Sequence, residues 1–139
     1  MNSICVFCAA SDGADPAYAA AADEMGRLIA AAGLRLVYGG GSIGLMGTVA
    51  RAAKRAGGEV IGVIPTFLRY VEAPQDDVTE MHVVQSMHER KQMMFDFADA
   101  FVSLPGGIGT MDETIEMMTW SQLDRHAKPI VLVDTLDYW

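Results

Sequence analysis

Short runs of apolar, mostly β-branched residues alternate with longer helix-type stretches along most of this chain. The apolar runs have the length of buried strands and lie at residues 4–8, 34–38, 59–64, 81–84, 100–104 and 129–133. The stretches between them predict helices at 16–32, 43–56, 87–98 and 109–123, whereas the mixed segment 66–77 predicts a loop with at most a helical turn. Strands that alternate with helices form right-handed β-α-β units, so the expected fold class is α/β, a doubly wound parallel sheet with helices on both faces.

A chain of 139 residues, 51% of them hydrophobic, is expected to form one Rossmann-like domain over residues 1–139. Ligands of such sheets bind beyond the carboxyl ends of the strands, where the strand order reverses. Only residues 134–139 follow the last predicted strand, which leaves no room for a helix to cover it. We therefore expect either that the C-terminal part of the domain is truncated or that another chain covers this strand.

The chain carries ten Lys and Arg against eighteen Asp and Glu, a formal charge of −8. This balance argues against binding of nucleic acid or of an anionic membrane over a broad surface, so a bound phosphate must be held locally. We recognise no signal peptide and no apolar run long enough to span a bilayer, and a cytoplasmic location is expected. Cys5 and Cys8 lie on opposite faces of a predicted strand, which favours buried thiols over a redox pair.

The first glycine-rich loop covers residues 39–47, GGGSIGLMG, and contains a G-x-G-x-x-G pattern between a predicted strand and a helix. The pattern alone suggests a dinucleotide site, but it follows the second strand, and Glu59 lies at the wrong edge of the sheet for a ribose contact. Two interpretations stay open. In one, the loop lets a ligand approach closely, and free N–H groups at the helix N-terminus bind its phosphate or sugar. In the other, Gly44 and Gly47 serve a tight turn and helix–sheet packing.

The second glycine-rich loop covers residues 104–113, LPGGIGTMDE, and leads from the fifth predicted strand into a helix. Bare N–H groups and the helix dipole favour an anion there, and Thr110 adds a hydroxyl. Thr110 and Glu113 also match a T-x-x-E capping box, in which Glu113 only bonds back to the backbone. Because the loop lies at the ligand edge of the sheet, a functional Glu113 is the favoured interpretation.

A third element, Ser86 to Lys91, begins a helix at the same edge of the sheet. Ser86 and Glu89 match a capping box, so Arg90 and Lys91 fall in the first turns, where the helix dipole disfavours cations. A local rule that is broken without visible compensation points to a functional site, and the alternative is a pair of solvated surface cations. No metal is expected, because the three histidines lack ligand spacing and the cysteines have no partners.

Together these elements resemble the Lonely Guy family of cytokinin-activating phosphoribohydrolases, which was formerly labelled possible lysine decarboxylase. The family motif P-G-G-x-G-T-x-x-E is matched by residues 105–113, and its M-x-x-R-K element by residues 87–91. The 39–47 loop and the Thr119-Trp120 pair are also similar to the family, and the resemblance runs from residue 4 to about residue 133. One departure follows the first strand, where the family usually has C-G-S-S and this chain has CAAS at residues 8–11.

The resemblance implies a homodimer that hydrolyses the N-glycosidic bond of a nucleoside 5′-monophosphate, such as cytokinin riboside monophosphate or AMP, to free base and ribose 5-phosphate. It assigns the catalytic pair to Arg90 and Glu113 and implies no cofactor. The substrate-binding residues that it implies are Ser11, Gly40, Gly41, Ser42, Glu72, Lys91, Gly106, Gly107, Ile108, Gly109, Thr110, Met111, Asp112 and Thr119.

Two other functions are weighed against this one. A non-enzymatic protein that binds a nucleotide-like ligand would use the same glycine loops, although it has no need of a carboxylate beside its anion. A lysine decarboxylase needs a Schiff-base lysine in a pyridoxal phosphate site. None of Lys54, Lys91 and Lys128 stands in a recognisable frame for that cofactor.

Overall fold

The computed structural model describes residues 1–139 and contains one six-stranded sheet in the order β4-β3-β2-β1-β5-β6. Every neighbouring pair of strands is parallel. The strands are β1 (Ser3–Phe7), β2 (Arg35–Tyr38), β3 (Val60–Pro65), β4 (Glu80–Val84), β5 (Ala100–Ser103) and β6 (Ile130–Leu132). The predicted α/β class and all six predicted strands are therefore confirmed.

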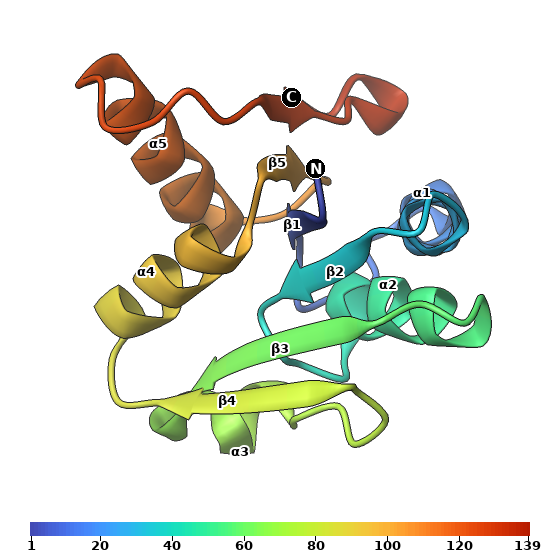
Figure 1. Ribbon diagram of the computed structural model, residues 1–139. Coiled ribbons are helices and arrows are strands. Elements are labelled where there is room, and N and C mark those ends of the chain that lie inside the picture. Colours follow the sequence, from blue (N-terminus) through green and yellow to red (C-terminus); the bar gives the residue numbers. More distant parts are fainter.

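The helices of the predicted β-α-β units connect these strands (Figure 1). They are α1 (Pro16–Ala31), α2 (Gly44–Arg55), α4 (Met87–Phe97) and α5 (Ile108–Gln122). The segment predicted as a loop forms the 3-10 turn η1 (Thr66–Leu68) and the single helical turn α3 (Arg69–Glu72), and a second 3-10 turn, η2 (Thr135–Asp137), follows β6. The helix α1 shows how the sequence sets these bounds: the Asp15 carboxylate caps it by accepting from the Ala17 N–H at 2.9 Å, and Gly33 follows its end with a φ of 73°.

Helices cover both faces of the sheet, and each face has its own apolar core. The core beneath α1 and α2 includes Val6 and Cys8, and the core beneath α4 and α5 includes Cys5 and Phe7. The alternation along β1 therefore sends the two cysteines to opposite faces, as the strand pattern predicts. Both thiols are free and buried, and burial raises their pKa above the ordinary value, so they are weak nucleophiles.

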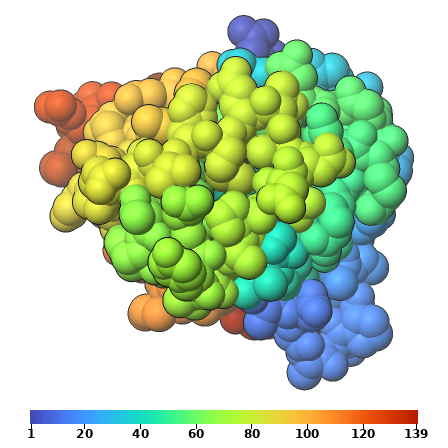
Figure 2. Space-filling model, turned by 90° about the horizontal axis from the view of Figure 1, so that it is seen from below, coloured from blue at the N-terminus to red at the C-terminus, as the bar shows by residue number.

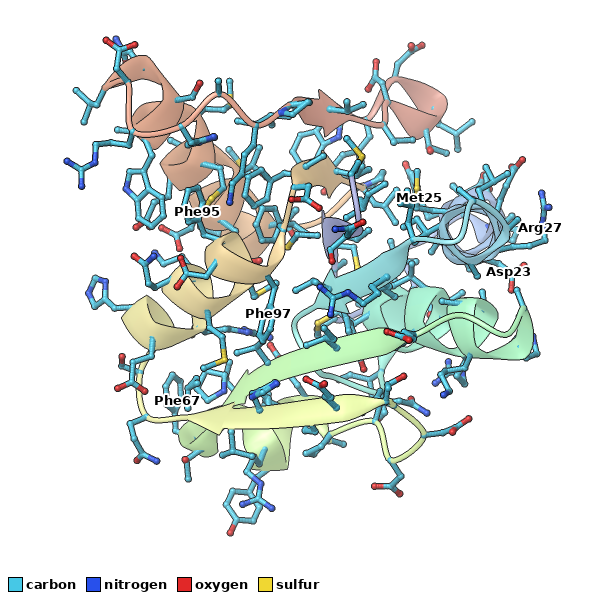
Figure 3. The ribbon with its side chains drawn as sticks, viewed as in Figure 1. Asp23, Met25, Arg27, Phe67, Phe95 and Phe97 are labelled. Atoms are coloured by element: carbon cyan, nitrogen blue, oxygen red, sulfur yellow. The ribbon has the colours of Figure 1, made fainter.

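The aromatic residues of α4 show how the second face is closed. Phe95 and Phe97 point to different neighbours (Figure 3). Phe95 packs edge-on against Trp120 of α5 with ring centroids 5.2 Å apart, and Phe97 lies 5.3 Å from the ring of His82 on β4. These contacts fix α4 between α5 and the far edge of the sheet, which sets the direction in which its first turn points.

The strand order reverses between β1 and β5. From β1 the chain builds outward through β2, β3 and β4, then returns to place β5 on the other side of β1. The loops after β1 and β5 therefore diverge and leave a crevice at the carboxyl ends of the strands, where α/β sheets bind ligands. At the opposite edge Val131 and Leu132 of β6 are exposed, as expected for a strand that no helix covers. No helix is both long and apolar enough to cross a membrane.

Candidate functional site

A cavity of about 350 Å³ opens at the reversal point between β1 and β5. It brings together side chains and backbone from all three elements that the sequence singled out. The sequence-predicted residues that line it are Ser11, Glu72, Arg90, Gly107, Gly109, Thr110 and Glu113. Both predicted catalytic residues thus face the same cavity, although 22 positions separate them in the chain.

Arg90 is a buried cation, only 3% exposed, whose guanidinium is held from three sides. Its Nε donates to the Val63 carbonyl oxygen at 3.0 Å, and one terminal nitrogen donates to the Gly39 carbonyl oxygen and, at 3.0 Å, to the Glu72 carboxylate. The Ser86 hydroxyl caps α4 by accepting from the Glu89 N–H, which confirms the predicted helix start. The guanidinium therefore has a fixed place in the cavity wall, and it is not a solvated surface cation.

Glu113 does not act as a capping residue. The helix α5 begins at Ile108, one residue earlier than predicted, with Gly107 as its N-cap and no side-chain cap. Glu113 therefore lies in the second turn and faces the cavity. Burial raises its pKa from 4.5 to about 7; Arg90 and Lys91 oppose the increase, while Glu72 and Asp112 add to it. A carboxyl that titrates near neutral pH is suited to general acid–base chemistry.

The N-terminus of α5 is open toward the cavity. The first N–H groups of a helix have no acceptor within it, and here no side chain caps them. Gly107 and Gly109 line the cavity, and a Cβ at either position would meet no atom within 4 Å, so a ligand can approach the backbone. Buried Thr110 stands beside them. Together with the helix dipole these groups form an anion site that needs no cation of its own.

Residues 40–42 of the first glycine-rich loop do not line the cavity. Gly41 pairs with Pro74 in an antiparallel bridge, and the Ser42 N–H donates to the Glu72 and Ala73 carbonyl oxygens at 3.1 and 2.7 Å. The Gly40 carbonyl oxygen accepts from Gln75. Of the 39–47 segment only Gly39 and Met46 line the cavity. The loop thus holds the α3 segment, and so Glu72, against the site.

The glycines that begin α2 serve packing, the second of the two interpretations that the sequence left open. Gly44 has a φ of 59°, and a Cβ there would lie 2.2 Å from the Ser11 nitrogen. A Cβ at Gly47 would lie 2.0 Å from the Ser42 oxygen. The first N–H groups of α2 bond the loop after β1, because Leu45 donates to the Ser11 oxygen. The expectation of free N–H groups at this helix start is therefore wrong.

Lys91 lies outside the cavity, in an ion-pair cluster between α4 and α5. It is 6% exposed and pairs with Asp112 at 3.1 Å and with Glu116. Burial lowers its pKa, but the hydrogen bonds to Glu116 and Asp112 outweigh burial, so the net shift is upward. These carboxylates offset the unfavourable position of the lysine at a helix N-terminus. The remaining predicted residues are also absent from the cavity lining: Ile108, Met111 and Thr119 are exposed on the outer side of α5, and Gly106 is buried.

Seven residues that line the cavity are not among the predicted site residues. They are Val6, Phe7, Cys8, Ala9, Ala10, Gly39 and Met46. The first five could be expected from the fold alone, because they lie at the carboxyl end of β1, which borders the point where the strand order reverses. Gly39 and Met46 both lie in the 39–47 segment that the sequence did single out, but nothing distinguishes Met46 from other apolar residues of a helix.

Comparison with known proteins gives independent findings. Residues 46–139 match the family model described as possible lysine decarboxylase. The cytokinin riboside 5′-monophosphate phosphoribohydrolase of Rhodococcoides fascians is 50% identical over 139 residues, which cover 99% of this chain and 70% of that protein. The enzyme of the same name, LOG, of Oryza sativa subsp. japonica is 49% identical over 134 residues, which cover 96% of this chain and 55% of that protein. The chain therefore spans between about half and seven tenths of the length of these relatives.

Solved structures share the fold at lower identity. The molybdenum cofactor binding protein of Rippkaea orientalis superposes with a TM-score of 0.75 and 26% identity, over 94% of this chain and 75% of that one. The Moco carrier protein of Chlamydomonas reinhardtii gives a TM-score of 0.78 and 27% identity, over 95% and 75% of the two chains. The overall fold is thus shared with these two proteins, while the sequence is more similar to the phosphoribohydrolases.

Proposed function

This chain belongs to the possible lysine decarboxylase family, whose relatives above are named phosphoribohydrolases, and we propose that it hydrolyses the N-glycosidic bond of nucleoside 5′-monophosphates. The substrates are cytokinin riboside monophosphate or AMP, and the products are the free base and ribose 5-phosphate. The single observation that carries the proposal is that Glu113, Arg90 and the open N-terminus of α5 line one cavity. Hydrolysis needs a carboxyl beside the anion site, whereas a carrier does not.

The 5′-phosphate lies at the N-terminus of α5. The N–H groups of Gly107, Gly109 and Thr110 donate to its oxygens, and the helix dipole stabilises its charge. Arg90 is the one Lys or Arg that lines the cavity, and it already pairs with Glu72. The backbone therefore carries most of the phosphate binding, which is how a chain of charge −8 binds an anion.

The ribose then lies across the cavity with C1′ near Glu113. Breaking the bond between C1′ and the base nitrogen leaves positive charge on the sugar, as in glycoside hydrolysis. Ionised Glu113 stabilises this charge and accepts a proton from the water whose oxygen bonds to C1′. The other proton of that water stays in the new 1′-hydroxyl. The base leaves with the electron pair and takes up the proton that Glu113 accepted, so Glu113 ends the cycle ionised again. Arg90, which stays charged, stabilises negative charge on the departing base.

Lysine decarboxylation finds no support at this site. Lys91 is held between two carboxylates, and Lys128 donates to the Phe95 carbonyl oxygen at 2.7 Å on the far side of α4. Lys54 lies in the last turn of α2. No lysine lines the cavity, so none is placed to form a Schiff base there.

We also propose that residues 1–139 form one nucleotide-binding unit that works as a homodimer in the cytoplasm. An apolar stripe supports dimer formation: Ile108, Met111, Ile115 and Met118 are all exposed on α5 at a spacing of three or four residues. The two free buried thiols fit a reducing compartment.

The test is to incubate the purified protein with AMP and with isopentenyladenosine monophosphate and to measure free base and ribose 5-phosphate. We expect release of both products in equal amounts. Glu113→Gln and Arg90→Ala are each expected to lower kcat by at least about 100-fold while the protein stays folded. Tight binding of AMP without base release over hours would favour the carrier function instead, and wild-type rates in either variant would refute the assigned roles.

A further inference from the structure

Tyr138, in the segment after β6, bonds the glycine loop that precedes α5. Its hydroxyl donates to the Gly106 carbonyl oxygen at 2.5 Å. This segment turns back toward α1 (Figure 1), where the half-exposed Tyr138 ring packs edge-on against Tyr18 with centroids 5.7 Å apart. Tyr138 does not line the cavity. Any effect that it has on a ligand must therefore pass through the loop.

The bond to Gly106 fixes more than one atom. The carbonyl of Gly106 and the N–H of Gly107 belong to the same planar trans peptide unit, so they point in opposite directions. Anchoring the oxygen on Tyr138 turns the N–H away from Tyr138, and Gly107 is a residue of the cavity wall. A Gly-Gly peptide has unusual freedom to rotate, and the anchor removes that freedom before a ligand arrives. The bond also polarises the peptide, which strengthens its N–H as a donor.

The Tyr18 ring extends the same support to the second loop of the cavity. Gly13 follows β1 with a φ of 77°, and a Cβ there would lie only 2.8 Å from the Tyr18 ring. The loop that supplies Ser11 is therefore packed on the ring that also packs on Tyr138. The edge-on pair of tyrosines joins the two loops that supply Ser11 and Gly107 to the cavity.

We propose that Tyr138 is a positioning residue for the phosphate site, whose hydroxyl aims the Gly107 N–H at the substrate phosphate. The proposal rests on the proposed function in that the anion is the 5′-phosphate of a nucleoside monophosphate. It predicts a defect that is specific to the phosphate, because the base and the ribose contact other parts of the cavity. General loosening of the fold would instead weaken every ligand alike.

The experiment compares Tyr138→Phe with its parent and with Tyr70→Phe, a control at a 95% exposed tyrosine of α3. All three proteins carry Glu113→Gln so that AMP is not consumed. Calorimetry measures binding of AMP, inorganic phosphate and adenosine, and thermal unfolding checks that each protein is folded. Tyr138→Phe keeps the ring and its contact with Tyr18. We expect it to bind AMP and phosphate roughly fivefold more weakly and adenosine unchanged, while Tyr70→Phe binds all three like the parent.

Unchanged AMP binding in Tyr138→Phe would overturn the proposal, and so would equal losses for AMP and adenosine. Failure of the parent to bind AMP or phosphate at all would overturn it as well. Base release by the wild-type protein is measured separately. Should that assay show no hydrolysis while Tyr138→Phe still loses phosphate affinity, the catalytic proposal fails and the positioning role stands.

Discussion

Glu113→Gln is expected to stabilise the protein at neutral and alkaline pH while it removes hydrolysis. Burial raises the pKa of this carboxyl from 4.5, its value in the unfolded chain, to about 7 in the folded protein. Between these two values the unfolded chain has released the proton while the folded protein still keeps it. The free energy of unfolding therefore falls as the pH rises from 4.5 to 7. Above pH 7 both states are ionised and the loss is complete.

The magnitude follows from the two pKa values. At about 1.4 kcal/mol for each pH unit between 4.5 and 7, the ionised carboxyl costs about 3 kcal/mol of stability above pH 7. Only about 1 kcal/mol of this loss is present at pH 5. A glutamine has the same size and no titration, so its own contribution is the same at both pH values. The stability difference between Glu113→Gln and the wild type should therefore grow by about 2 kcal/mol from pH 5 to pH 8.

Urea unfolding at pH 5 and pH 8 measures this difference, in a buffer without phosphate because phosphate would occupy the anion site and stabilise the fold. Glu24→Gln is the matched control, since the Glu24 side chain is 65% exposed on α1. Its stability curve should run parallel to that of the wild type. Parallel curves for Glu113→Gln as well would show that Glu113 titrates as an ordinary carboxyl, and the basis for its role as a base near pH 7 would be lost.

Three further outcomes follow from contacts at the site. Gly44→Ala should lower the free energy of unfolding by about 3 kcal/mol in urea, because a Cβ there would meet the Ser11 backbone at 2.2 Å at a φ of 59°. Gly57→Ala, with a φ of 82° but open space, should cost only about 1 kcal/mol, and equal losses would refute the packing argument. Glu72→Gln should move the acidic limb of the pH profile of kcat/KM to lower pH, because Glu72 raises the pKa of Glu113. If the limb stays at the same pH, it does not report the titration of Glu113. Lys91→Met should cost about 2 kcal/mol by leaving Asp112 and Glu116 unpaired, and unchanged thermal stability would contradict this.

Most of the fold could be predicted because local patterns and tertiary structure agree. No strand bound differs from the prediction by more than one residue, and α1 ends where Gly33 permits it. The short α3 turn was harder to predict, since its position depends on contacts with residues 40–42 that are remote in the sequence. Figure 2 views the molecule from below, and green and yellow segments of the middle of the chain form much of this face. Phe67 and Tyr70 in the η1 and α3 turns are exposed, so little apolar burial fixes the position of these turns.

The two glycine-rich loops show why composition alone does not identify a binding loop. Both lie after strands at the same edge of the sheet, and both start a helix. The N–H groups that begin α2 meet the carbonyl oxygens of Ala9 and Ser11, because the loop after β1 passes beside them. Nothing passes in front of Gly107 and Gly109. The two loops therefore differ in whether another chain segment occupies their N–H groups, and this depends on the order of the strands in the sheet.

Glu72 at the end of α3 lines the cavity beside Arg90 of α4, with which it pairs at 3.0 Å. Its position gives the site an electrostatic balance. With Glu113 protonated, the charges of Arg90 and Glu72 cancel; with Glu113 ionised, the cavity side chains carry a net negative charge.

A phosphate dianion at α5 must then raise the pKa of Glu113 further, since like charges oppose ionisation. By linkage, AMP binds more tightly to the protonated form, so its affinity should fall as the pH rises through 7. The acidic limb of kcat, which reports the bound enzyme, should accordingly lie at higher pH than that of kcat/KM. If the acidic limbs of kcat and kcat/KM fall at the same pH, phosphate and Glu113 do not share this cavity.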